Sequence, residues 1–192
     1  MDKQNNLRII WDILTRPDAY FKGIAASLPE LRAFVVSYGV PLVVLAAAGR
    51  MTRILLIHEI EETPLQGNQL TGIFIITVTA YALSVYIGAY VVEKLAPAFK
   101  SEPNRDKSML IIMLAYTPYL LAQAVSFIFP VLHAELILGL IYTVVLFGVG
   151  ASHLLNTPIN KVWGFTLVTY FVIFSISYLS MMLLTEMLIF AR

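Results

Sequence analysis

The sequence contains no cysteine and little charge. Without cysteine, disulfides, thiolate metal sites and cysteine nucleophiles are excluded. Charged residues make up 13% of the 192 residues and hydrophobic residues 59%, with a mean hydropathy of +0.80. Soluble domains are about 25% charged and about 45–50% apolar. The composition therefore excludes disorder, a nucleic-acid-binding domain and most soluble enzymes, and it indicates an integral membrane protein.

Sequence patterns for catalysis are also missing. The aspartates are Asp2, Asp12, Asp18 and Asp106, all in charged segments, which excludes an intramembrane aspartyl pair. The chain has no G-x-S-x-G elbow and no phosphate-binding glycine-rich loop. We therefore expect no enzyme activity, no catalytic residues and no cofactor.

One segment has a partial metal-binding pattern. It begins at His58, but Glu62 stands where a zinc helix has its second histidine. No metal site is predicted, and His58, Glu59 and Glu62 are only weak candidates for holding a divalent cation in an acidic, non-cytoplasmic loop.

Five stretches without charged residues divide most of the chain. A charged side chain at the bilayer centre costs roughly 2.5–3.5 kcal/mol, so spans are expected between charges. The stretches are Ala33–Gly49, Thr63–Val92, Ser108–Ala134, Leu136–Asn160 and Val162–Thr185. Four of them reach the ~20 residues that cross a hydrocarbon core, and apolar residues 54–57 extend the first. The sequence predicts an all-α polytopic membrane protein: a cytoplasmic amphipathic segment (1–31) and a domain of five transmembrane helices (32–192), over about 32–57, 68–92, 108–130, 135–155 and 162–187.

Lysine and arginine are unevenly distributed around these spans. Arg50, Arg53 and Arg192 lie on one predicted side. The other side carries Lys3, Arg8, Arg16, Lys22, Arg32, Lys94, Lys100, Arg105, Lys107 and Lys161. Because basic loops favour the cytoplasm, we expect a cytoplasmic N-terminus and a C-terminus on the outside.

The N-terminal segment is expected to form two short helices separated by Pro17. In the first, apolar side chains cover one half of the helical wheel and charged side chains lie on the other. Such a helix either lies in the headgroup plane, with Trp11 on its apolar face, or packs against the end of the bundle. Thr15 and Ser27 each stand two residues before a proline and three before an acid, so each is expected to cap the helix that follows.

Arg50 and Arg53 share one face of the first predicted span. The favoured interpretation is that both extend to the interface near the helix end. The alternative is that they face a bundle interior or polar cavity, where an arginine would mark a functional site. Pro41, Pro118 and Pro130 interrupt spans and are expected to kink them.

Small residues at spacing four predict helix-packing faces in two spans. They are Ala80, Ser84 and Gly88 in the second span and Gly148 and Ser152 in the fourth. These rows predict packing and no chemistry.

Motifs of Tyr, Pro and Gly recur from the third span to the fifth. They are Ala115-Tyr-Thr-Pro-Tyr-Leu-Leu-Ala122, Gly139-Leu-Ile-Tyr142, Leu146-Phe-Gly-Val-Gly-Ala-Ser-His153 and Asn156-Thr-Pro-Ile-Asn-Lys161. Together with the opening Ile9–Phe21, they resemble the Yip family (Ypt/Rab-interacting-protein-like membrane proteins) in its bacterial form. The resemblance implies five spans, a cytoplasmic N-terminus and a bacterial inner membrane.

In eukaryotic relatives the family is linked to vesicle traffic and small prenylated GTPases, through a longer N-terminal region and an Asp-Leu-Tyr-Gly-Pro signature. This chain lacks that signature, and only Tyr116 and Pro118 echo it. The GTPase role is therefore not carried over.

Two classes of function remain. The leading hypothesis is a non-catalytic bundle that organises or recruits partners or lipid. The alternative is a transporter or channel for a small solute or ion, in which oligomerisation would complete the walls of a cavity. Expected partners are the lipid bilayer and a second copy or another membrane protein, but not nucleic acid. The candidate motif, cavity or partner residues are Tyr116, Pro118, Tyr119, Gln123, Asn156, Lys161, Arg50 and Arg53.

Overall fold

The protein is described here by a computed structural model of residues 6–62, 67–128 and 133–190, with side chains described except at 67, 68 and 176–190. This part of the chain is helical and contains no strand. The elements are α1 (Asn6–Thr15), α2 (Pro17–Ala26), α3 (Leu31–Phe34), the π-helical turn η1 (Val35–Gly39), α4 (Val40–Ile60), α5 (Gly67–Leu95), the 3₁₀ turn η2 (Ala96–Phe99), α6 (Arg105–Ala115), α7 (Thr117–Val125), the 3₁₀ turn η3 (Ser126–Ile128), α8 (Ala134–Leu154) and α9 (Ile159–Phe190).

Among the described residues, four helical segments are long and apolar enough to cross a membrane. They are Leu31–Ile60, Gln69–Phe99, Arg105–Ile128 and Ala134–Leu154. The part of α9 with described side chains adds a shorter apolar helix, Ile159–Ser175. The predicted fold class, an all-α polytopic membrane protein, is confirmed.

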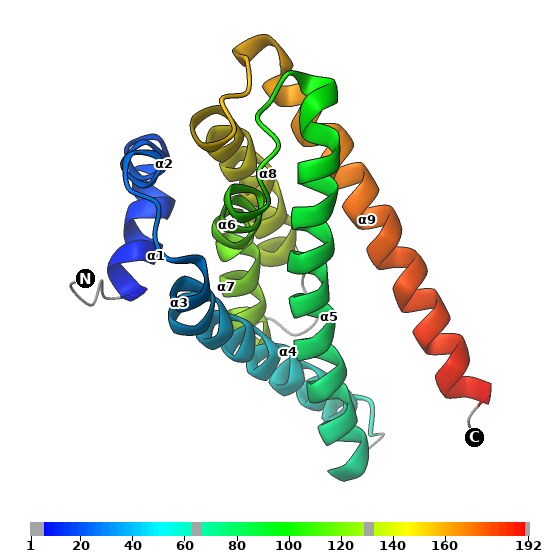
Figure 1. The fold of residues 1–192 in the computed structure, drawn as a ribbon. Helices are drawn as coiled ribbons and strands as arrows, with labels where there is room; N and C mark the ends of the chain where they lie inside the picture. The colour runs from blue at the N-terminus through cyan, green and yellow to red at the C-terminus, as the bar shows by residue number, and fades with distance from the viewer. Residues whose placement is uncertain (1–5, 63–66, 129–132, 191–192) are drawn as a thin grey trace.

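The segment formed by α6 and α7 lies at the centre of the bundle (Figure 1). α6 packs against α5 and α8, and α7 packs against α4 and α8. Every side chain from Leu110 to Pro118 is buried. A helix that is apolar on all sides is buried by its neighbours, and α6 has that character from Met109 to Ala115.

Two prolines stand where a span changes its helical geometry. The π turn η1 precedes Pro41, the second residue of α4, and a break at Tyr116 precedes Pro118, the second residue of α7. Proline has no N–H and clashes with the preceding turn, so the regular hydrogen-bond ladder is interrupted there. Pro130 lies outside the described residues.

The N-terminal helices α1 and α2 pack against the bundle, and α2 lies against α8 (Figure 1). Ile9, Ile13 and Phe21 are buried there, whereas Leu7 and Trp11 are 72% and 67% exposed. Of the two predicted arrangements, the structure therefore shows packing against the bundle. The amphipathic face is divided, because part of its apolar surface points away from the protein.

The prediction that Thr15 and Ser27 cap the helices that follow them is wrong. The Thr15 hydroxyl donates to the Trp11 carbonyl (2.7 Å) instead of accepting from α2. The N-cap positions fall on Arg16 and Glu30, neither of which makes a side-chain cap. Ser27 ends α2 and does not begin α3. With Thr15 and Ser27 as N-caps, α2 and α3 would start at residues 16 and 28, but they start at Pro17 and Leu31. Both hydroxyls are therefore out of reach of the free N–H groups at the helix starts.

Candidate functional site

Two loops are joined at one end of the bundle. The Glu102 N–H donates to the Leu155 carbonyl (2.8 Å), and the hydroxyls of Ser101 and Thr157 share a hydrogen bond of 2.8 Å. We call this end, formed by α1, α2 and the 100–104 and 155–158 loops, the basic end. Ten of the thirteen basic residues belong to the segments that build it or flank it, although Lys3 lies outside the described residues.

The predicted residue Asn156 belongs to this junction, together with an ion pair. Glu102 Oε2 accepts from Lys107 Nζ at 2.9 Å and from Asn156 Nδ2 at 3.2 Å. Asn156 has a φ of 52°, a left-handed conformation that asparagine adopts more readily than most residues. The hydrogen bond and charge of Lys107, followed by the hydrogen bond of Asn156, lower the pKa of the Glu102 carboxyl. Lys161 lies nearby in the first turn of α9 and is half-buried.

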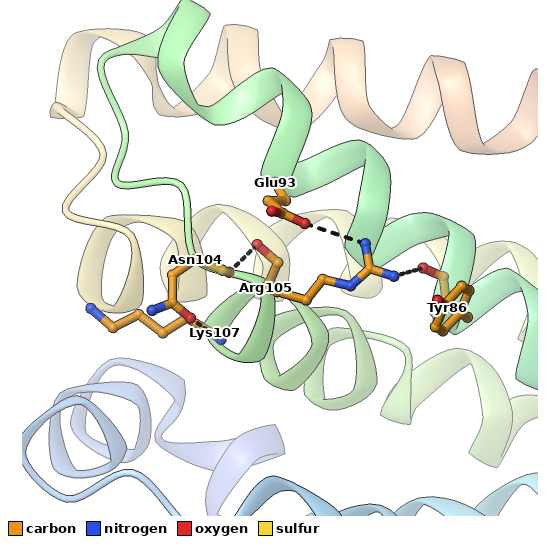
Figure 2. A network of polar contacts seen from close by, with 6 residues as sticks. Tyr86, Glu93, Asn104, Arg105 and Lys107 are labelled. Atoms are coloured by element: carbon orange, nitrogen blue, oxygen red, sulfur yellow. Dashed lines mark hydrogen bonds and ion pairs between the residues drawn. The ribbon is translucent and has the colours of Figure 1, made fainter.

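Arg105, which the sequence analysis did not single out, joins α6 to α5 (Figure 2). Its guanidinium lies 3.4 Å from the carboxylate of Glu93 and donates to the Tyr86 carbonyl at 3.4 Å. It also stands 4.7 Å from the ring centre of Tyr86 and 5.4 Å from that of Tyr90. The spacing of Tyr86, Tyr90 and Glu93 on one face of a helix was the available signal. Asn104 caps α6 by accepting from the Lys107 N–H at 3.0 Å.

Among the described residues, three polar contacts fix the N-terminal helices to the bundle. His153 Nε2 lies 2.7 Å from Asp18 Oδ1, and the Tyr142 hydroxyl donates to the Leu14 carbonyl at 2.7 Å. Asn6 donates to the Ser37 carbonyl at 2.7 Å. Pro41, four residues after Ser37, has no N–H to offer that carbonyl, so Asn6 supplies a donor where the helix lacks one.

The predicted residues Tyr116, Pro118, Tyr119 and Gln123 come together around the break between α6 and α7. Gln123 is 5% exposed, and its Nε2 donates to the Tyr119 hydroxyl at 2.9 Å. Tyr116 packs edge-on against Tyr119 and is stacked on Tyr170 of α9. This is an interior aromatic cluster whose one buried amide is satisfied within the protein, as buried polar groups require.

Arg50 and Arg53 differ in their surroundings. Arg53 is 6% exposed, and its Nη2 lies 2.7 Å from Nε2 of His133. The Arg53 guanidinium is therefore covered by the protein, and its expected position near the membrane interface stays a prediction. Arg50 is half-buried and lies near Tyr81 of α5. The structure does not bring these arginines together with Asn156 or Lys161, which lie at the basic end.

Of the predicted packing residues, both glycines contact neighbouring helices. A Cβ on Gly88 would lie 3.3–3.5 Å from side chains of Ile112 in α6 and Ile173 in α9. One on Gly148 would lie 3.4–3.5 Å from Val162 and Thr166 in α9. The hydroxyls of Ser84 and Ser152 instead bond within their own helices, to the carbonyls of Ala80 and Val149.

The weak cation candidates lie at the end of α4 and just after it. His58 is half-buried and Glu59 exposed near the end of α4, and Glu62 follows with a φ of 55°. In the part of the chain that the structure describes, no three His, Asp or Glu side chains gather as metal ligands.

The fold and these contacts define an all-α polytopic membrane protein with a polar, cross-linked basic end. The Yip1 domain family model matches residues 11–182, which is most of the chain. The chain therefore belongs to the Yip1 domain family. Comparison with curated proteins and with solved structures finds no match.

Proposed function

We propose that the protein is a non-catalytic membrane organiser, which recruits protein partners or lipid at its basic end in the inner membrane of a bacterium. The observation that carries the proposal is the docked pair α1–α2. Its inner face is buried on the bundle, while Leu7 and Trp11 on the outer face are 72% and 67% exposed. A surface patch of large apolar side chains beside basic residues is suited to contact with a partner or a headgroup layer.

The orientation belongs to the same proposal. The N-terminal helices and the loops before α6 and α9 lie at one end, and basic segments favour the cytoplasm. The basic end is then cytoplasmic. A second copy of the chain or another membrane protein is the expected protein partner.

Site-specific photo-crosslinking in cells tests this function. A photoreactive residue at Leu7 or Trp11 is expected to give adducts of defined mass, with protein or with lipid. The matched control is Ile141 of α8, which is 57% exposed but lies within a span. Adducts that are the same at all three positions, or a monodisperse protein with none, would overturn the proposal.

The second candidate is a transporter or channel, and the observation in its favour is the buried Arg53 within a predicted span. Against it, the guanidinium is engaged by His133, and the buried Gln123 is engaged by Tyr119. Proteoliposome flux decides between the two. Flux of a small solute or ion that the double substitution Arg50→Ala and Arg53→Ala abolishes supports transport, and an absence of flux in the parent protein removes it.

A further inference from the structure

A charged hollow lies between the N-terminal helices and the start of the first span. It has a volume of about 710 Å³ and is walled by α1, α2 and the linker before α3. Arg8, Arg16 and Asp12 line it, with Tyr20 and Ser27. Arg8 lies 3.7 Å from Asp12, so these three groups leave one positive charge in excess. The hollow therefore suits an anionic group large enough to fill it.

An apolar cleft opens between α4 and α5. Its volume is about 160 Å³, and α6 forms part of its wall. Its lining is almost entirely apolar and includes Val43, Ala82, Val85, Met109 and Met113. Pockets for drug-sized ligands have roughly 300–1,000 Å³. The cleft is narrower than that, and methionine walls adapt to flexible occupants, so it suits a hydrocarbon chain better than a ring system.

Two stacked aromatic rings lie between the hollow and the cleft. Phe34 lines the charged hollow, Tyr38 lines the apolar cleft, and their ring centres are 4.9 Å apart. The Tyr20 hydroxyl is buried and has no hydrogen-bond partner among the described residues. Burial raises the pKa of Tyr20, and the nearby Tyr38 and Asp12 raise it further. The protonated phenol belongs to the lining of the charged hollow.

We infer that the hollow and the cleft together form a binding site for one anionic phospholipid, whose phosphate faces Arg8 and Arg16 and whose acyl chain enters between α4 and α5. The cleft lies within predicted membrane-spanning helices, where the available chains are those of the bilayer. The hollow lies at the basic end, where the headgroup region meets α1 and α2. Guanidinium groups bind phosphate through charge-assisted hydrogen bonds. The inference deepens the proposed function, on which it rests, by naming the lipid class.

Lipid binding to the purified full-length chain tests the site. Native mass spectrometry in detergent would compare phosphatidylglycerol, which is anionic, with phosphatidylcholine, which is zwitterionic and has the same chains. We expect tighter binding of phosphatidylglycerol. The double substitution Arg8→Gln and Arg16→Gln should weaken it about tenfold or more, the effect of losing one charge-assisted hydrogen bond. Ala82→Phe, which fills the cleft, should also weaken it.

Matched controls separate the site from general effects of charge and bulk. Arg32→Gln removes an exposed charge near the first span without touching the hollow, and Leu83→Phe adds a ring on an exposed face of α5 beside the cleft. Both should bind phosphatidylglycerol like the parent. The melting temperature and elution volume of every variant show whether it is folded.

The inference is overturned if the two lipids bind equally, if the test and control substitutions have equal effects, or if inorganic phosphate alone displaces the lipid. Loss of binding in the arginine variant while Ala82→Phe binds normally also overturns it, because the chain would then not occupy the cleft. The crosslinks at Leu7 and Trp11 are measured independently of lipid binding. Failure of the lipid assay alone would overturn this inference and not the proposed function.

Discussion

The ring of Phe21 in α2 lies against Gly150 in α8 so closely that a Cβ on Gly150 would fall 2.9 Å from Cε1 of Phe21. Phe21 is 0% exposed. Because Gly150 has no side chain, α8 leaves room there for the ring of Phe21, which anchors the N-terminal helices. The docked α1 and α2 therefore have an apolar anchor in addition to the polar contacts of Asp18 and Leu14.

Gly150→Val is expected to destabilise the docked N-terminal helices by about 1–3 kcal/mol, the usual cost of overpacking. Thermal unfolding in detergent and protease cleavage in the 27–30 linker measure it. Gly23→Val is the control, because a Cβ at Gly23 meets no atom within 4 Å. Equal protease sensitivity of the two variants would show that the Phe21 contact does not hold α2.

Gly49→Val should disrupt the packing of α4 against α7. A Cβ at Gly49 would overlap backbone atoms of Gln123 and Ala124, which have no rotamer by which to move aside. We expect a loss of about 3 kcal/mol or failure to fold. Gly72→Val in α5, where a Cβ meets nothing within 4 Å, should fold normally. A Gly49→Val protein with the parent's melting temperature would contradict the close approach of the two helices.

Arg105→Lys is expected to lower stability by about 0.5–1 kcal/mol, although the charge is kept. Lysine lacks the planar guanidinium that stacks on Tyr86 while reaching Glu93. A double-mutant cycle with Tyr86→Leu isolates the stacking contribution to the free energy of unfolding. Lys161→Arg, a charge-preserving change elsewhere at the basic end, serves as control. A coupling free energy of zero would refute the stacking role.

The Glu102 contacts should make stability depend on pH in the acid range. Folding lowers the pKa of Glu102, so the stabilisation is complete above the ordinary value of 4.5 and is lost as the pH falls through the lowered folded value. The effect is small because the carboxylate is exposed. Glu102→Gln should remove this small component of the pH dependence of the melting temperature, and Asp106→Asn should retain it. The proposed role of Glu102 fails if both variants titrate like the parent.

The membrane orientation is testable with single cysteines, because the chain has none of its own. A cysteine at the exposed Lys100 should react with an impermeant thiol reagent only after the cells are opened, and one at the exposed Glu59 should react in intact cells. These positions lie at opposite ends of the first two spans. The reverse labelling pattern would place the basic end outside and remove the orientation from the proposal.

Charge spacing and proline position predict most of the helical arrangement, because both act locally. Each long uncharged stretch overlaps a helix in the described part of the chain, and the breaks before Pro17 and Pro118 fall where the missing N–H requires them. The caps failed for a local reason as well: a shift of one residue at Thr15 moves the hydroxyl from capping α2 to bonding within α1.

The contacts of the basic end could not be predicted in the same way. Arg105 reaches residues of α5 that precede it by 12 to 19 positions, and Asp18 meets His153 from a distance of 135 positions. Such pairs depend on how whole helices cross, which a single sequence does not specify. Arg53 shows the same limit, since its partner His133 lies 80 residues later in the chain.

The junction between the 100–104 and 155–158 loops also determines how the bundle can move. Two hydrogen bonds of 2.8 Å tie the connection from α5 to α6 to the connection from α8 to α9. The ends of α5, α6, α8 and α9 are therefore joined through their loops, which restrains tilting of these helices at the basic end. Tilting about this restrained end would displace the helices most at the opposite membrane face.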